Sequence, residues 1–263
     1  MKIATWNVNS IAARLPHVLE WLEKNAPDVL LLQELKTTED NFPRLELSAL
    51  GYTAAVLGQK AWNGVAILSR HKIENIETGF PGDASDEPAR YIEATVEGIR
   101  VASVYLPNGN PVGTEKFDYK LKWMDRLHDR VRSLLKTEQP FVMGGDYNVI
   151  PEDRDCHDPH LWKDDALFRP EVRRKFRTLL NLGLTDAFRA HNDEAHQYTF
   201  WGYQGGAWQS NSGIRIDHFL LSPQTADLLE DCFIDTAPRG KDKASDHTPI
   251  VLKLRKAQKL HNA

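Results

Sequence analysis

The chain of 263 residues contains 41% hydrophobic and 27% charged residues, a balance typical of a folded protein with a substantial core. Its formal net charge of −4 at pH 7 does not by itself favour a polyanionic partner. The first residues lack a basic stretch followed by an apolar run, and no later apolar run reaches membrane-spanning length. We therefore expect a cytoplasmic protein that does not enter a membrane.

The sequence gives no sign of division into several units. It contains no short repeat, low-complexity tract or linker rich in glycine, serine and proline, so we expect one domain over residues 1–263. Cys156 and Cys232 are far apart and belong to no metal-binding or redox spacing. The sequence therefore indicates neither a disulfide framework nor a zinc site.

The first part of the chain predicts a strand at residues 3–6, a helix at about residues 15–24 and an apolar strand at residues 29–32. Pro16 would lie at the start of this helix and Pro27 beyond its end. Strands rich in β-branched and aromatic residues are predicted at 52–57, 65–68, 91–96 and 101–105, with Gly98 between the last two. Their short connections favour antiparallel pairing.

A long helix is predicted next, because apolar residues recur at three- and four-residue steps from Phe117 to Leu135. A strand at 141–143 and a helix at about 170–182, ended by Gly183, follow it. The last predicted strands lie around 198–201, 216–221 and 250–254. Helices interspersed among many strands predict an α+β layered sandwich with the helices outside.

Polar residues follow nearly every predicted strand. These residues are Asn7 and Asn9, Gln33 and Glu34, Tyr105, Asp146 and Asn148, Asp217, and Asp246 and His247. If the strands share a sheet, several of these groups can converge at one edge, where loops commonly carry functional sites.

Glu34 and Asn7 are candidate metal ligands. Glu34 ends an apolar run, and Mg²⁺ takes one or two carboxylates while it keeps waters and phosphate oxygens as other ligands. Alternation along an extended chain would place Asn7 and Asn9 on one side, where an amide can bind the metal or orient a carboxylate. The alternatives are a capping or surface glutamate and turn-forming asparagines.

Asp146 and Asn148 follow an apolar strand and two glycines, Gly144 and Gly145, which would let the chain turn closely. In extended geometry both side chains face one way. The carboxylate could then take a proton from water while the amide donates to a phosphate oxygen. The alternative is an Asx-type turn.

His247 and Tyr105 complete the candidate chemistry. His247 changes charge near neutrality and could stabilise an attacked phosphate, while the preceding Asp246 could reach a metal. Tyr105 could donate to a phosphate oxygen or assist a leaving oxygen. A capping turn and a structural tyrosine are the alternatives. The chain lacks zinc spacings, a Gly-x-Ser-x-Gly elbow and a phosphate-loop lysine, so these groups indicate metal-assisted attack on a phosphodiester.

A DNA substrate would require a local positive surface. Two basic groups are candidates, although each is also typical of a solvated helix face. They are Lys116, Lys120, Lys122 and Arg126 in one segment, and Arg169, Arg173, Arg174, Lys175 and Arg177 in another.

Six ordered motifs over nearly the whole chain resemble the exonuclease III family of abasic-site endonucleases, within the endonuclease/exonuclease/phosphatase superfamily. They are Trp6-Asn7-Val8-Asn9, Leu32-Gln33-Glu34-Leu35-Lys36, Tyr105-Leu106-Pro107, Gly145-Asp146-Tyr147-Asn148, Gly213-Ile214-Arg215-Ile216-Asp217 and Ser245-Asp246-His247. The resemblance implies an α/β fold, a four-layer α/β sandwich of two packed, mostly antiparallel β-sheets flanked by helices. It places the site at the common edge of the sheets.

The resemblance also implies the site chemistry. One or two Mg²⁺ ions, or Mn²⁺ in their place, would be held chiefly by Glu34, and the further candidate ligands are Asn7, Asp146, Asn148, Asp246 and His247. Asp146 would activate the water, and Asn148 would orient it or stabilise the transition state. His247, supported by Asp217, would contact the attacked phosphate, and Tyr105 would assist there or at the leaving group.

The family's substrate pocket accepts a flipped sugar without a base, whose extrusion costs little stacking. The resemblance implies DNA contacts from Arg90, Phe200, Trp201, Trp208 and Arg215. The sequence departs from common family patterns at Ala89, His218 and Leu167. A bulky Leu167 near the DNA predicts hindered cleavage at internal abasic sites, with recessed 3′ ends spared.

We therefore expect a Mg-dependent DNA-repair phosphodiesterase. Its activities on double-stranded DNA would be abasic-site endonuclease, 3′-5′ exodeoxyribonuclease and 3′-phosphodiesterase/phosphatase, in a monomer without an obligate protein partner. Two other hypotheses stay open: a superfamily phosphodiesterase that acts on phosphoinositide or sphingolipid, and a non-catalytic nucleic-acid binder. Salt-sensitive binding without turnover would favour the last.

Overall fold

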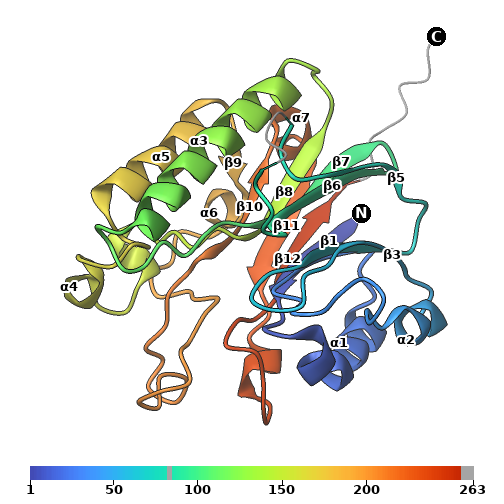
Figure 1. Ribbon diagram of the computed structural model, residues 1–263, viewed down its shortest axis with the longest axis horizontal. Coiled ribbons are helices and arrows are strands. Elements are labelled where there is room, and N and C mark those ends of the chain that lie inside the picture. The colour runs from blue at the N-terminus through green and yellow to red at the C-terminus, as the bar shows by residue number, and fades with distance from the viewer. Residues whose placement is uncertain (82–84, 256–263) are drawn as a thin grey trace.

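The computed structural model describes residues 1–81 and 85–255. Two six-stranded sheets pack face to face between helices (Figure 1). In spatial order, the first sheet contains β11 (Leu229–Ile234), β12 (Ile250–Leu254), β1 (Lys2–Asn7), β2 (Val29–Gln33), β4 (Val65–Ser69) and β3 (Thr53–Leu57). The second contains β5 (Glu74–Thr78), β6 (Tyr91–Val96), β7 (Ile99–Tyr105), β8 (Phe141–Asp146), β10 (Asp217–Leu221) and β9 (Thr185–Asp186).

Each sheet contains one parallel pair, β1 with β2 and β7 with β8, and its other pairs are antiparallel. The helices α1 (Ile11–Asn25) and α2 (Arg44–Ala49) cover the first sheet, and α3 (Glu115–Leu135) and α5 (Pro170–Asn181) cover the second. The predicted four-layer α/β sandwich of mostly antiparallel sheets is therefore confirmed.

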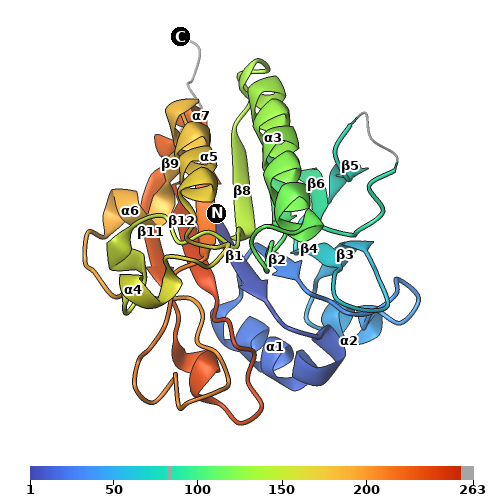
Figure 2. The ribbon, with the colours of Figure 1, turned by 60° about the vertical axis from the view of Figure 1, so that its left-hand side comes forward.

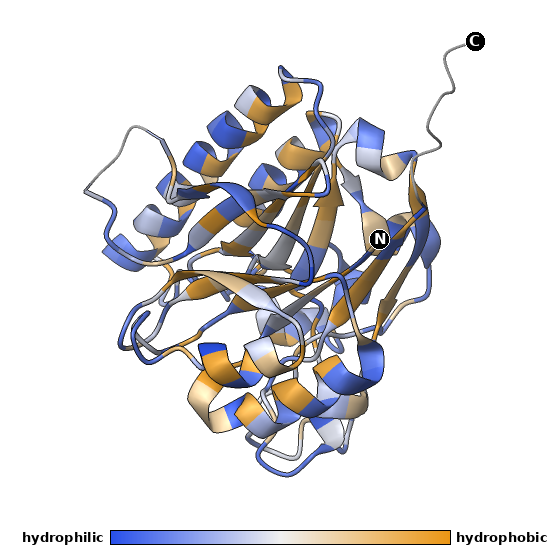
Figure 3. Ribbon diagram, turned by 90° about the vertical axis from the view of Figure 1, so that its right-hand side faces the viewer, coloured by the Kyte–Doolittle hydropathy of each residue, from blue (hydrophilic) through white to orange (hydrophobic). Residues whose placement is uncertain are grey.

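Three apolar layers hold the four structural layers together. Along β1 and β2, alternate side chains go to opposite faces: Ile3 and Leu31 pack between the sheets, whereas Ala4 and Leu30 pack under α1. Strands that are buried on both faces need apolar residues at every position, which explains their continuous hydrophobic runs. Hydrophobic residues accordingly dominate the central strands, whereas each helix carries both hydrophobic and hydrophilic residues (Figure 3).

Two long helices were predicted well. α3 buries Phe117, Met124 and Leu127 against the second sheet at the three- and four-residue spacing seen in the sequence. α5 has Pro170 at its first position and ends just before Gly183, which adopts a φ of +113° that favours glycine.

Three predicted elements were wrong in extent or type. The strand predicted at 141–143 continues to Asp146 as β8. α1 begins at Ile11, one turn earlier than predicted, because the Ser10 hydroxyl caps it by accepting from the Ala13 amide; Pro16 therefore lies inside the helix. Residues 198–201 form no strand, and Phe200 makes only isolated bridges to Ile214 and His247.

Several elements gave no recognisable pattern. The edge strand β5 exposes every residue, so it shows no apolar alternation, and β11 alternates only weakly. The short helices are α2, α4 (Pro159–Trp162), α6 (Ala187–His191) and α7 (Pro223–Ala226), with 3₁₀ turns at Asp153–Asp155 and Ala237–Gly240. None of the helices within the described ranges has the length and apolar character needed to cross a membrane.

Candidate active site

The pairing of the central strands brings the predicted polar residues to one edge of the sandwich. Asn7 ends β1 opposite Gln33 at the end of β2. In the other sheet, Asp146 at the end of β8 lies between Tyr105 on β7 and Asp217 on β10. The long loops that precede β10 and β12 extend on one side of the molecule (Figure 2). The sheet registers thus explain why residues far apart in sequence meet here.

An acidic cluster with one histidine lies at this edge. Glu34, Asp146 and His247 each present a possible ligand atom, and these atoms lie within 4.8 Å of one another. The Asn7 amide lies between the two carboxylates: its Nδ2 donates to Glu34 Oε1 at 2.9 Å and to Asp146 Oδ2 at 3.0 Å. Asn7 is fully buried, so its amide holds both acids in a fixed relation.

Glu34 owes its orientation to the chain that follows β2. The residue has a φ of +51°, and the next two amides donate to the carbonyls of Gly64 and Asn63. The Nζ of Lys36 lies 3.1 Å from Glu34 Oε2. Burial would raise the pKa of Glu34, but the Asn7 hydrogen bond and the charges of His247 and Lys36 together lower it below its usual value. Glu34 is therefore an anion at neutral pH.

Asp146 and Asn148 converge by a turn and not by extended geometry. The backbone amide of Asn148 donates to Asp146 Oδ1 at 2.9 Å, and Asn148 has a φ of +47°, so these residues form an Asx-type turn and the predicted extended geometry was wrong. Gly144 and Gly145 lie within β8 and form no turn. A Cβ at Gly145 would lie 1.9 Å from the Val104 carbonyl oxygen, so the glycine is required by close strand packing.

His247 lies between two buried carboxylates. Its Nδ1 is 2.8 Å from Asp217 Oδ2 and its Nε2 is 3.7 Å from Asp146 Oδ2. Burial would lower the pKa of His247, but the negative charges of Asp217 and Asp146 raise it to about 10. Burial, with the charges of Asp217 and Glu34, raises the pKa of Asp146 to about 7 although His247 opposes this shift. The site thus pairs a charged imidazolium with a carboxyl that titrates near neutrality.

Asp246 reaches the cluster through Asn9. The Asn9 Nδ2 donates to Asp246 Oδ1 at 3.1 Å, and Lys36 Nζ donates to Asn9 Oδ1 at 2.6 Å. The prediction that Asn7 and Asn9 share one side of an extended chain was wrong, because β1 ends at Asn7 and Asn9 has a φ of +45°. The turn points the Asn9 amide toward Asp246.

Tyr105 faces the same carboxylates. Burial, together with the negative charges of Glu34 and Asp146, raises the pKa of its phenol well above the usual value, so the hydroxyl remains a donor. The guanidinium of Arg90 lies 4.8 Å from the Tyr105 ring centroid, and Arg90 Nη1 donates to the Tyr105 carbonyl at 3.3 Å. Arg90 therefore orients Tyr105.

A cavity of about 250 Å³ opens at the cluster. One side is polar, and the other is an apolar wall. The polar lining consists of Glu34, Tyr105, Asn108, Asn110, Asp146, Asn148, Asp165, Asp246 and His247, and the wall consists of Trp162, Leu167, Phe200, Ile214 and Ile216. Sequence reasoning did not select Asn108, Asn110, Trp162 or Asp165. Asn108 and Asn110 lie beyond the residue that ends β7, Tyr105, and Trp162 and Asp165 follow no strand end.

Some predicted DNA contacts lie in the interior. Arg215 was predicted to bind DNA, but it is fully buried and its guanidinium contacts Asp155 at 2.7 Å and Asp186 at 2.9 Å. Trp201 is also buried, and its indole donates to Asn211 Oδ1. The prediction of direct contact was wrong for these two residues, because both are packed against protein. Arg90, Phe200 and Trp208 remain partly exposed.

The two basic segments are less available than their composition indicates. Lys120 is fully buried and donates to the carbonyls of Asn108 and Asn148. Arg126 donates to Asp86, and Lys175 pairs with Asp125. Other members, including Lys116, Lys122, Arg174 and Arg177, are exposed. A continuous positive surface cannot therefore be assigned to either segment as a whole.

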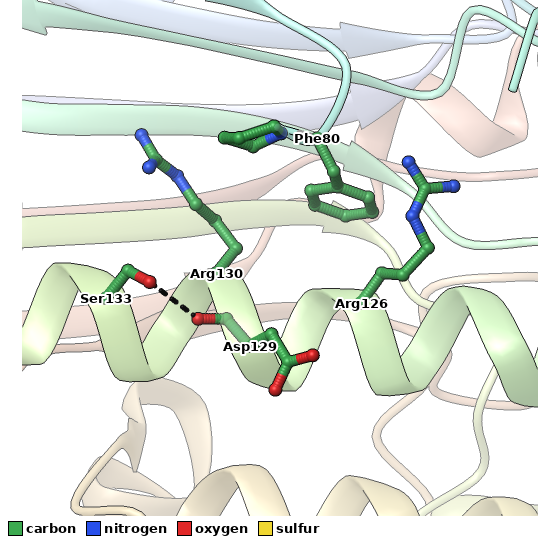
Figure 4. Close-up of a pocket in the computed structure, with 6 residues that line it drawn as sticks. Phe80, Arg126, Asp129, Arg130 and Ser133 are labelled. Atoms are coloured by element: carbon green, nitrogen blue, oxygen red, sulfur yellow. Dashed lines mark hydrogen bonds between the residues drawn. The ribbon is translucent and has the colours of Figure 1, made fainter. Parts of the chain in front are cut away.

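A second cavity, of about 130 Å³, lies between α3 and Phe80 (Figure 4). Arg126 and Arg130 extend from the helix on either side of Phe80, but both guanidiniums already contact carboxylates. Asp129 is the carboxylate in its lining, and no group there resembles the cluster around Asp146. The chemistry is therefore assigned to the larger cavity.

The donor set of the larger cavity fits a hard divalent cation. Carboxylate oxygens from Glu34 and Asp146 converge with the Asn7 amide, and Asp246 lines the same cavity. Oxygen ligands of this type suit Mg²⁺ or Mn²⁺ better than a soft metal, and no thiolate lies in the lining.

The model of the Endonuclease/Exonuclease/phosphatase family matches residues 4–247. The chain belongs to this family. It is 34% identical to the exodeoxyribonuclease III of Haemophilus influenzae, covering 95% of this chain and 98% of that protein. It is 33% identical to the DNA repair nuclease APEX1 of Danio rerio, covering 96% of this chain and 81% of that protein.

Solved structures agree with this assignment. A 3′ phosphatase NExo from Neisseria, bound to a product DNA hairpin, has a TM-score of 0.94 and 41% identity over 97% of this chain and 99% of its own. An AP endonuclease from Archaeoglobus fulgidus has a TM-score of 0.93 and 38% identity over the same shares of the two chains. The predicted resemblance to exonuclease III is confirmed, and the chain is a hydrolytic nuclease of the DNA-repair type.

Proposed function

We propose that this nuclease uses Mg²⁺ to hydrolyse phosphodiesters at abasic sites and 3′ ends of double-stranded DNA. The observation that carries the proposal is the convergence of Glu34, Asp146 and His247 on one cavity. The chain is similar to relatives named as exodeoxyribonucleases and AP endonucleases, and the similar structure of the 3′ phosphatase NExo contains a product DNA hairpin.

The cavity suits a phosphate that is joined to a sugar. Its polar side can face the phosphate oxygens, and its wall of Phe200, Ile214 and Ile216 offers apolar contact to a deoxyribose. A sugar without a base leaves the stack at little cost, so an apolar pocket of this size favours it. We also propose DNA contacts from Arg90, Phe200 and Trp208 at its rim.

Asp146 is proposed as the general base. Its pKa of about 7 lets it take a proton from water at physiological pH, since a base works best when its pKa lies near the operating pH. The side-chain amide of Asn7 donates to Asp146 Oδ2, and the backbone amide of Asn148 donates to Asp146 Oδ1. The base is therefore held in one orientation before substrate arrives.

His247, Asn148 and Tyr105 are proposed to stabilise the phosphate. His247 is cationic while its pKa stays near 10, and Asp217 holds the ring. The Asn148 side chain donates one N–H to the Leu106 carbonyl, which leaves its second N–H for a phosphate or water oxygen. Tyr105 keeps its proton and can donate to the phosphate or to the departing oxygen.

Glu34, Asn7 and Asp246 are proposed as the principal metal-binding residues, with Asp146, Asn148 and His247 close to them. A bound Mg²⁺ would neutralise charge that develops on the phosphate and on the departing 3′ oxygen. Lys36 pairs with Glu34 in the present arrangement and so offsets the carboxylate charge without the ion.

The test uses purified protein and two end-labelled duplexes, one with an internal abasic analogue and one undamaged with a recessed 3′ end. We expect cleavage of the abasic strand and trimming of the 3′ end with Mg²⁺, and neither product with EDTA. Asp146→Asn serves as the matched inactive variant, because it preserves size but cannot accept the proton.

Cutting that persists in EDTA would contradict the metal requirement. Binding of both duplexes without turnover would favour the non-catalytic nucleic-acid binder. Failure to bind or cut either duplex, with hydrolysis of a phosphoinositide or sphingolipid headgroup, would favour the lipid phosphodiesterase.

A further inference from the structure

Lys120 is a buried cationic side chain that the proposed chemistry does not use. It lies on the second turn of α3, where it is fully buried, beside a cavity lined by catalytic groups. Burial of a lysine is costly unless its ammonium is well compensated, and most lysines stay exposed for this reason. Its position therefore calls for a specific role.

The ammonium of Lys120 is held by two main-chain carbonyls. Its Nζ donates to the Asn148 carbonyl at 2.6 Å and to the Asn108 carbonyl at 3.0 Å. Within residues 1–81 and 85–255, no other donor reaches either oxygen, and Lys120 forms no ion pair. The two carbonyls would lose their partner if the ammonium were removed.

The side chain is enclosed on the side of Gly109. This glycine has a φ of +84°, and a Cβ there would lie 2.5 Å from the Lys120 Cδ. The same Cβ would lie 3.4 Å from that of Ala166. Lys120 is thus confined between α3, the segment after β7 and the segment that carries Leu167.

Both carbonyls belong to residues that shape the phosphate side of the cavity. Asn148 has a left-handed backbone, and its backbone N–H donates to the carboxylate of Asp146, the proposed base. Asn108 Nδ2 donates to Asn148 Oδ1 at 3.3 Å, and Asn148 Nδ2 donates to the Leu106 carbonyl at 2.9 Å. One ammonium therefore joins the two strand-end segments that carry the asparagines.

The surroundings of Lys120 act on its charge in opposite directions. Burial lowers the pKa of Lys120 to about 7, although the carboxylates of Asp146 and Asp165 oppose this shift. A protonated or a neutral amino group has enough N–H donors for both carbonyls. Because neither carboxylate contacts Nζ within the described residues, the contacts that fix its place are the two carbonyls.

We infer that Lys120 is a positioning residue, whose side-chain Nζ holds the Asn108 and Asn148 segments, by hydrogen bonds to their carbonyls, in the arrangement that phosphodiester hydrolysis requires. The inference rests on the proposed function, because Asn148 is the group through which Lys120 acts. It differs from a general stabilising role, which would affect binding and turnover alike.

The experiment is a double-mutant cycle on the full chain. Single-turnover trimming of the recessed 3′ end is measured with Mg²⁺ for Lys120→Met, Asn148→Ala and the combined variant, and DNA binding is measured with EDTA. We expect Lys120→Met to lower the rate about 10- to 100-fold and to change the binding constant less than about threefold. In the Asn148→Ala background, the same change should lower the rate by less than about threefold.

Lys136→Met is the matched control, since Lys136 follows the last residue of the same helix and is exposed. It should retain the wild-type rate. Equal loss from Lys120→Met in both backgrounds, or a wild-type rate in the single variant, would overturn the inference. If Lys120→Met does not fold, Lys120→Gln replaces it, and failure of both to fold would show a role in stability alone. Inactive wild-type protein would instead overturn the proposed function.

Discussion

Asp217 Oδ2 lies 2.8 Å from His247 Nδ1, and both side chains are buried. This contact directs the other ring nitrogen, Nε2, toward the Asp146 carboxylate. Asp217 and Asp146 together keep the imidazole protonated against the effect of burial, so that its pKa rises to about 10. The strand pairing between β8 and β10 is what places the two acids around one histidine.

Replacement of Asp217 by asparagine should therefore impair catalysis through His247. We expect Asp217→Asn to lower the single-turnover rate about 10- to 100-fold, as for other partners that orient a reacting group. Loss of one negative charge lowers the pKa of His247, so the imidazole loses its proton at a lower pH than in the wild type. Activity should therefore fall at a lower alkaline pH than in the wild type. Asp231→Asn, beside the more exposed His191, is the control. An unchanged alkaline limb would contradict the assigned role.

The rate constant below neutral pH should follow the deprotonation of Asp146. Burial and the neighbouring carboxylates raise its pKa to about 7, and the proposed base works only when deprotonated. The rate constant should therefore rise as pH increases through neutrality. Asp146→Asn should lower the rate at least about 100-fold at every pH. A wild-type rate that is flat from acidic to neutral pH would argue against Asp146 as the base.

Metal binding should be visible without turnover. Glu34 is expected to hold Mg²⁺, so saturating Mg²⁺ should raise the melting temperature of the wild-type protein. At about 100 times the dissociation constant, a ligand that binds only the folded state adds about 2.7 kcal/mol of stability. Glu34→Gln should lose most of this increment, whereas Glu23→Gln, which is exposed on α1, should retain it. Equal increments in both variants would remove Glu34 from the metal site.

The strand-end residues were predictable because they break a strong apolar pattern. Glu34 follows β2, Asp146 ends β8 and Asp217 begins β10, all strands with buried residues, and the sheet order then brings the three acids together. The local geometry was less accessible. Asn9 and Asn148 adopt left-handed backbones that are set by hydrogen bonds to Asn7 and Asp146, which no periodicity reveals.

Charge alone did not reveal whether a basic residue is buried. Lys120 belongs to one of the two candidate basic segments, and the family resemblance implied a DNA contact from Arg215, yet tertiary partners enclose both side chains. Arg215 pairs with Asp155 from the 3₁₀ turn at Asp153–Asp155 and with Asp186 from β9. These elements are separate in sequence, so their meeting depends on the complete fold. A sequence shows the charge of a side chain, but its burial follows from packing.

The buried position of Arg215 leads to a stability prediction. Arg215→Met should remove the guanidinium from Asp186 and leave Arg189 as the ion-pair partner of Asp155, so it should reduce the free energy of unfolding by about 3–5 kcal/mol. The exposed substitution Arg132→Met should change it by no more than about 0.5 kcal/mol. Denaturant titration measures both. A stable Arg215→Met protein with a reduced salt dependence of DNA binding would restore the surface role.

Leu167 should set the balance between the two DNA substrates. Its buried side chain lines the cavity beside Trp162 and Phe200, and its carbonyl accepts from the Ile150 amide, so the wall cannot easily move aside. An internal abasic nucleotide must enter with DNA on both sides, whereas a recessed 3′ end brings less bulk past this wall. We therefore expect Leu167→Gly to increase cleavage at the abasic analogue relative to 3′ trimming.

The ratio of the two rates is the appropriate measurement, because removal of a buried leucine also costs about 2–5 kcal/mol of stability. A smaller folded fraction lowers both rates by the same factor, so this effect cancels in their ratio. Leu179→Ala, buried in α5 away from the cavity lining, supplies a destabilised control whose ratio should match the wild type. An unchanged ratio in Leu167→Gly would show that this side chain does not select between internal and terminal sites.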